Sequence, residues 1–177
     1  MRHTLVALVE DKPGVLNRVA SLFRRRAFNI ESLTVGHTER PGVSRMTIVI
    51  DSDPTGARRC VAHLYKLVNV IQVDDLAEKP VVNRDLALVK VNSVGDARAG
   101  LLRVVDETRA HIVDTGAATM TVEITGEPEH VDLVISRLQP YGVVEMVRTG
   151  LVAMSRGDEA LRMPNGGYAT QAAVALD

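Results

Sequence analysis

The chain has 177 residues, of which 46% are hydrophobic, so it can bury a core as one domain or as two small ones. Its formal net charge of −1 provides no overall field that would attract nucleic acid or an anionic membrane. Only 3% of the residues are aromatic and Trp is absent, which disfavours a surface that stacks nucleotide bases.

Hydrophobic periodicity in the first half of the chain predicts alternating strands and helices. An apolar strand over residues 3–10 leads through the turn at residues 10–14 into an amphipathic helix. The predicted buried face of this helix consists of Val15, Leu16, Val19, Leu22 and Phe23. A strand from Asn29, an alternating strand ending at Ile50, a helix from Pro54 and a strand from Val70 complete the order βαββαβ.

The same order of elements recurs in the second half of the chain. The pattern predicts a strand over 86–91, a helix from Ala97, strands over 111–114 and 120–124, a helix from Pro128 and a strand over 143–147. We therefore predict an α+β fold of two ferredoxin-like βαββαβ units. The predicted boundaries are a domain over 1–77, a charged linker over 78–84, a second domain over 85–157 and a mobile tail over 158–177.

The first strand is apolar on both faces, with Leu5, Ala7 and Val9 on one face and Val6 and Leu8 on the other. Helices cover only one face of such a sheet, so the second face needs another partner. We expect that partner to be a second copy of the chain, and therefore a homodimer.

The turn before the first helix is the best candidate for a binding site. Gly14 permits a tight turn and a close approach of the backbone to a ligand. The free N–H groups from Gly14 to Leu16 could hold a carboxylate, and Asp11 could pair with an ammonium group. Two simpler interpretations stay open: Pro13-Gly14 as an ordinary turn, and Asn29 as a side chain that satisfies local backbone groups.

Other classes of site find little support. The five histidines share no metal-ligand spacing, and no phosphate-binding loop, nucleophile elbow or dinucleotide motif occurs, so we expect no metal, no cofactor and no catalytic residue in this chain. The apolar residues 5–9 are too few for a membrane span and lack a cleavage site for a signal peptide. The single cysteine, Cys60, falls beside the apolar stripe of the second helix, and we expect it to be a core thiol. These features predict a cytoplasmic protein that binds neither membranes nor nucleic acid.

Several motifs occur in the order found in one known family. They are Glu10-x-x-x-Gly14-Val15-Leu16-x-Arg18-Val19, Asn29-Ile30-Glu31-Ser32-Leu33, Ser44-Arg45-Met46-Thr47-Ile48, and Arg148-Thr149-Gly150 followed by Ser155-Arg156-Gly157. Residues 1 to about 157 closely resemble the small, regulatory subunit of acetolactate synthase (acetohydroxyacid synthase). The resemblance implies an N-terminal ACT domain, the amino-acid-sensing form of βαββαβ, followed by an ACT-like domain.

The function that the resemblance implies is regulation without catalysis. A subunit of this family activates a catalytic large subunit that uses thiamine diphosphate, FAD and Mg²⁺, and a branched-chain amino acid, typically valine, inhibits the complex. The implied effector site comprises Asp11, Pro13, Gly14, Val15, Leu16, Asn29 and Ile30. Family members often have Asn at position 11, so Asp11 leaves the preferred amino acid open.

Two other functions are compatible with parts of the pattern. A freestanding tandem ACT protein that senses an amino acid and acts on transcription or on another enzyme would have about this length. An acylphosphatase-like hydrolase would need an Arg in the first loop, where this chain has the acidic Asp11. The motif series favours the synthase subunit over both.

Overall fold

The computed structural model describes residues 1–161, which form two compact units. The first unit consists of Met1–Val82 together with Leu151–Leu161, and the second consists of residues 83–150. The sequence interpretation assigned 85–157 to one domain, whereas the contacts group Leu151–Leu161 with the first unit. We call Leu151–Leu161 the return segment. Of the predicted mobile tail, residues 162–177 lie outside the described part of the chain.

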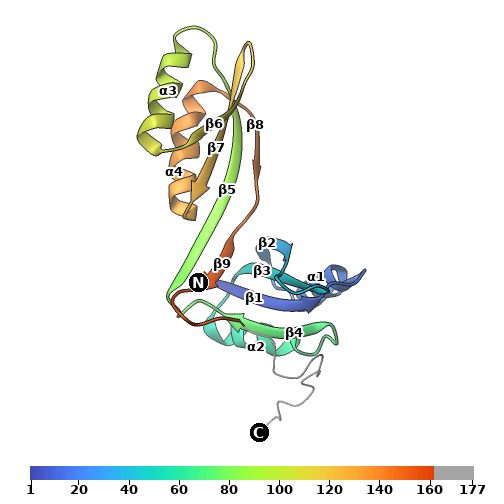
Figure 1. Ribbon diagram of the computed structural model, residues 1–177. Helices are drawn as coiled ribbons and strands as arrows, with labels where there is room; N and C mark the ends of the chain where they lie inside the picture. Colours follow the sequence, from blue (N-terminus) through green and yellow to red (C-terminus); the bar gives the residue numbers. More distant parts are fainter. Residues whose placement is uncertain (162–177) are drawn as a thin grey trace. The chain divides into compact units, whose positions relative to one another are not determined.

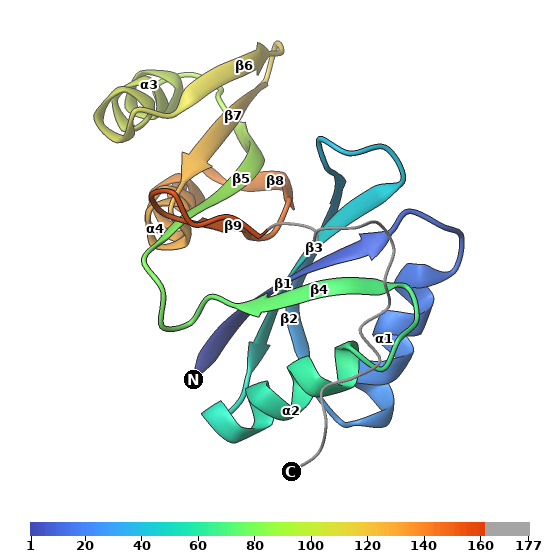
Figure 2. The same cartoon turned by 60° about the horizontal axis from the view of Figure 1, so that its bottom comes forward.

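The first unit contains the six predicted elements in the predicted order (Figure 1). They are β1 (Arg2–Glu10), α1 (Val15–Arg25), β2 (Ile30–His37), β3 (Val43–Asp51), α2 (Pro54–Leu64) and β4 (Val70–Asp75). The strands form one antiparallel sheet in the order β2-β3-β1-β4, and both helices pack on one face of it (Figure 2).

Local chemistry explains where the two helices begin. Gly14 precedes α1 with φ of 83°, a left-handed conformation that glycine adopts without strain. Pro54 occupies the first turn of α2, and the Asp53 carboxylate accepts a 2.5 Å hydrogen bond from the Gly56 N–H as the helix cap. The predicted buried face of α1 is confirmed except at Leu16, which is 46% exposed because it lies beside rather than on the core-facing stripe.

The second face of the first sheet is covered in part by the chain itself. Val6 is buried on this face together with Leu76, which follows β4, and with Ala153 of the return segment. Ala153 belongs to a short strand that the periodicity did not predict, β9 (Val152–Ser155), which pairs with the start of β5 (Val81–Asn92). The burial that we attributed to a second copy is therefore supplied in part by the return segment.

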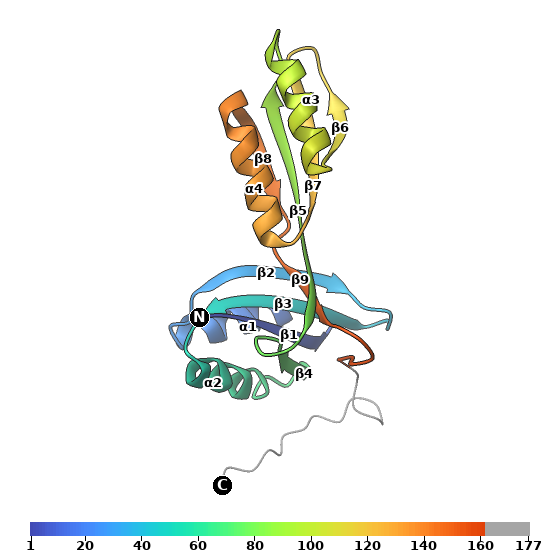
Figure 3. The same cartoon turned by 90° about the vertical axis from the view of Figure 1, so that its left-hand side faces the viewer.

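The second unit repeats the topology of the first. After β5 it contains α3 (Ala97–Thr108), β6 (His111–Thr115), β7 (Thr119–Gly126), α4 (Pro128–Leu138), the short 3₁₀ helix η1 (Gln139–Tyr141) and β8 (Val143–Arg148). Its sheet has the order β6-β7-β5-β8, and α3 and α4 cover one face (Figure 3). The predicted α+β class with two βαββαβ units is thus confirmed. Strand β5 begins within the predicted linker 78–84.

Among the described residues, no helix is long and apolar enough to cross a membrane.

Candidate functional site

The turn between β1 and α1 presents a partly open helix start, in which the Val15 N–H donates a 3.3 Å hydrogen bond to the Lys12 carbonyl. No side chain caps the first turn of α1, and an added Cβ at Gly14 would meet no atom within 4 Å. The backbone N–H groups at the beginning of a helix attract anions, because they carry the positive end of the helix dipole. Exposed Pro13 and half-exposed Leu16 flank this point. The arrangement can accept a carboxylate with an aliphatic group beside it.

Hydrogen bonds below the turn hold it in place. The side chain of Asn69 donates a 2.5 Å hydrogen bond to the Glu10 carboxylate and accepts one of 2.6 Å from Arg18 of α1. The hydrogen bond from Asn69, followed by that from Lys12, keeps the pKa of Glu10 below its ordinary value. The Asp11 N–H also donates to the Gly42 carbonyl at 2.8 Å. The two ends of the turn are therefore fixed before any ligand arrives.

Asp11 has a neighbour that the sequence did not indicate. Its carboxylate lies 3.3 Å from Nδ1 of His37, at the end of β2, and both side chains are exposed. His37 comes from a stretch that reads as turn chemistry, and nothing local in the sequence connects it with Asp11. The contact arises because β1 and β2 run in the same direction and their last residues lie at the same end of the sheet.

Asn29 and Ile30 lie at the other end of the sheet. Ile30 is paired with Ile50, which is paired with His3, seven residues before Glu10 on β1. At about 3.3 Å per residue, this places Ile30 roughly 23 Å from the turn. Strands β1 and β2 run in the same direction, as Figure 3 shows, so the start of one is remote from the end of the other.

One chain therefore brings together only part of the predicted set. Asp11, Pro13, Gly14 and Leu16 are exposed at the turn, while Val15 is buried and supports the helix from the core side. Asn29 is exposed at the opposite end, and Ile30 packs partly against the helix-covered core. A single chain thus places the predicted residues in two separate groups, the turn at residues 11–16 and the pair Asn29–Ile30.

Neither group of residues has the composition of a metal centre. Within the described range, 1–161, no three His, Cys, Asp or Glu side chains are grouped so that they could hold a metal ion. The one cysteine, Cys60, is buried in the core, and burial raises the pKa of its thiol to about 12. The predicted interpretation of Cys60 as a core thiol is confirmed.

Comparison with known proteins gives a consistent assignment for both units. Residues 5–72 match the family described as AHAS small subunit-like ACT domain, and residues 84–157 match the family described as small subunit of acetolactate synthase. The acetolactate synthase small subunit of Mycolicibacterium smegmatis is 44% identical over 159 residues, which cover 90% of this chain and 94% of that protein.

Two further relatives come from distant organisms. A probable acetolactate synthase small subunit of Archaeoglobus fulgidus is 45% identical over 159 residues, covering 90% of this chain and 99% of that protein. The crystal structure of the acetolactate synthase small subunit from Thermotoga maritima superposes with a TM-score of 0.83 at 38% identity, covering 90% of this chain and 99% of that one. The matches extend through both units and in the order of the motifs. The chain belongs to the acetolactate synthase small-subunit family.

Proposed function

We propose that this chain is the non-catalytic regulatory subunit of acetolactate synthase. In this proposal it binds the catalytic large subunit, raises its activity, and makes it sensitive to feedback inhibition by valine in the cytoplasmic synthesis of branched-chain amino acids. The observation that carries the proposal is the similarity to acetolactate synthase small subunits, which covers 90% of the chain and includes both units. Thiamine diphosphate, FAD and Mg²⁺ would belong to the large subunit.

The effector would bind between two copies of the chain. The turn at residues 11–16 and the pair Asn29–Ile30 lie at opposite ends of the first sheet, so neither copy has a complete site. A two-fold axis beside the edge strand β2 would reverse the direction of the second copy. Each end of one copy would then lie beside the opposite end of its partner, and two complete sites would form per homodimer.

The turn at residues 11–16 and the pair Asn29–Ile30 would be the two half-sites, and each would contribute a different part of the recognition. The helix start at Gly14–Leu16 would hold the carboxylate of valine, with Leu16 contacting its aliphatic side chain. Asp11 would attract the ammonium group, although its contact with His37 offers that carboxylate a competing partner. Asn29 would reach the effector from the second copy.

Two measurements on the reconstituted complex test the proposal. Purified chain added to the large subunit should raise acetolactate formation, and valine should lower it again. Asn29→Ala should remove the response to valine and leave the activation in place, because the residue is exposed and remote from the core. A wild-type chain that neither raises turnover nor changes the valine response would contradict the proposal.

A further inference from the structure

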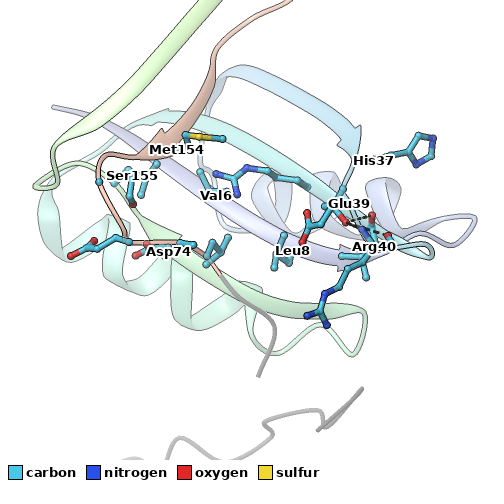
Figure 4. A pocket seen from close by; sticks show the side chains of 16 residues that line it. Val6, Leu8, His37, Glu39, Arg40, Asp74, Met154 and Ser155 are labelled. Carbon is cyan, nitrogen blue, oxygen red and sulfur yellow. Dashed lines mark hydrogen bonds between the residues drawn. The ribbon is translucent and has the colours of Figure 1, made fainter. Parts of the chain in front are cut away.

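A cavity lies on the face of the first sheet that the helices leave uncovered. Its volume is 870 Å³, which is within the range of small-molecule pockets. Val6 and Leu8 of β1 form its floor, with Met154–Ser155 of the return segment on one side and Glu39–Arg40 of the β2–β3 connection on the other (Figure 4). None of the residues predicted for the effector site lines it.

Arg45 supplies the most unusual charge in this cavity. Arg45 of β3 is paired with Leu8 of β1, so the Arg45 side chain projects from the same face of the sheet as the Leu8 side chain. The guanidinium is half-buried, and burial lowers the pKa of Arg45, which means that its charged form lacks full solvation. Nη2 donates a 2.6 Å hydrogen bond to the carbonyl of Ala153. Among the described residues, Arg45 forms no ion pair with a carboxylate.

Of the three carboxylates that line the cavity, Asp74 and Glu159 have a cation of their own, and Glu39 is the third. Lys79 lies 2.8 Å from the Asp74 carboxylate and 3.8 Å from that of Glu159. Asp74 and Glu39 influence Arg45 only at longer range. A half-buried guanidinium whose nearest acceptor is a neutral carbonyl favours the arrival of an anion, and its planar donors match a carboxylate in particular.

Part of the lining is aliphatic, beside the polar and charged side chains of the β2–β3 connection and the return segment. Besides Val6 and Leu8, the side chains of Leu76, Ala160 and Leu161 line the cavity. A ligand that satisfies both features has a carboxylate for Arg45 and a short branched hydrocarbon chain for the floor. Inorganic phosphate would leave the aliphatic floor uncovered, and a neutral hydrocarbon would leave Arg45 without a counter-charge.

We propose that this cavity binds a branched aliphatic carboxylate, an amino acid or the corresponding 2-oxo acid, with Arg45 as the carboxylate receptor. The site is complete in one chain and so differs from the proposed effector site, which needs two. It rests on the geometry of the first unit and stands whether or not the chain regulates acetolactate synthase.

The test is an NMR titration of the full chain with 3-methyl-2-oxobutanoate and, separately, with valine. Met154 is 59% exposed at the cavity wall, and its methyl signal should shift and saturate. Arg45→Gln keeps a side-chain N–H donor but removes the charge. The loss of a charge-assisted hydrogen bond should weaken binding about tenfold to a hundredfold. The neutral ketone 3-methyl-2-butanone should bind no better to the wild type than to this variant.

Three control variants distinguish binding at Arg45 from binding elsewhere on the chain. Ser32→Ala removes the hydrogen bond that the Ser32 hydroxyl accepts from the Leu151 N–H of the return segment, without changing the charge of the cavity, so it should keep the wild-type affinity. Arg45→Lys should restore part of the binding that Arg45→Gln loses. Asn29→Ala should abolish any valine binding at the proposed effector site and leave the Met154 response intact. Equal affinity in Arg45→Gln and the wild type, or an unchanged Met154 signal at saturation, would overturn the proposal.

If valine binds more tightly than the 2-oxo acid, its ammonium group is recognised too, and Glu39 and Asp74 are the nearby carboxylates. Equal affinities would mean that the carboxylate and the aliphatic chain carry the binding alone.

Discussion

The hydroxyl of Ser32 accepts a 3.2 Å hydrogen bond from the N–H of Leu151, a residue 119 positions later in the chain. The pairing of β2 with β3 shifts by one residue between Ile30 and Ser32. This bulge turns Ser32 away from the helix-covered face, onto the face that carries the return segment. Strand β2 therefore links the candidate effector residues at its start to the return segment two residues later.

Ser32→Ala should destabilise the first unit by about 1 kcal/mol, the usual net value of one intramolecular hydrogen bond. Urea denaturation of the wild type and the variant measures the difference. Ser32→Thr is the matched control because it keeps the hydroxyl, and it should lie close to the wild type. Equal midpoints for the wild type and Ser32→Ala would mean that the return segment is held without this hydrogen bond.

Substitutions at Gly14 should separate backbone strain from charge. The φ of 83° disfavours any side chain, although Asn tolerates it better than most residues. We expect Gly14→Asn and Gly14→Asp to lose similar stability, about 1 kcal/mol. Only Gly14→Asp places a negative charge at the open helix start, so it should abolish the response to valine while activation continues. The valine dose response of both reconstituted variants checks this. A normal response in Gly14→Asp would exclude the helix start as the carboxylate site.

The hydrogen bond from Asn69 to Glu10 should affect how the free energy of unfolding depends on pH at acidic pH. Because the folded-state pKa of Glu10 is lowered, its contribution to stability is present above the unfolded-state value of about 4.3 and is lost as the pH falls through the folded-state value. Asn69→Ala removes the largest cause of the lowering. The pKa of Glu10, followed by NMR, should rise in the variant, and the dependence of stability on pH below about 4.5 should become weaker. An unchanged titration of Glu10 would mean that the Asn69 hydrogen bond does not set this pKa.

Cys60 should resist thiol reagents in the native protein. Its pKa of about 12 leaves very little thiolate at pH 8, and the side chain is fully buried. Reaction with a disulfide reagent should be slow under native conditions and fast in denaturant, where the pKa returns to about 8.5. Rapid labelling of the native chain would show that α2 opens readily at this position.

Much of this architecture could be predicted from hydrophobic spacing alone. The elements of each βαββαβ unit follow periods that local sequence reveals, and most of them have one face in a core, although β6 and β8 are exposed along almost their whole length. Strand β9 and the early start of β5 could not be found in this way. Each of them owes its position to contacts distant in sequence, such as the hydrogen bond from the Arg156 N–H to the Pro80 carbonyl. Nothing in the four residues Val152–Ser155 distinguishes them from a loop.

The candidate site was predictable in its parts but not in its arrangement. The turn at Gly14 and the exposed Asn29 could be identified from residue type and from the family resemblance. Their separation to opposite ends of the sheet depends on the pairing of β2 with β3, which residue types do not specify. The contact of Asp11 with His37 and the support of Glu10 by Asn69 likewise depend on the folded sheet.

The return segment also bears on how the chain is completed during synthesis. Arg45 of β3 meets its acceptor Ala153 108 residues later, and the whole second unit is translated between them. A nascent first unit therefore emerges from the ribosome with Val6 and its neighbours uncovered on one face of the sheet. Such long-range closure is slow, and exposed apolar surface favours aggregation in the interval. The unit that is synthesised first is thus the last to complete its packing.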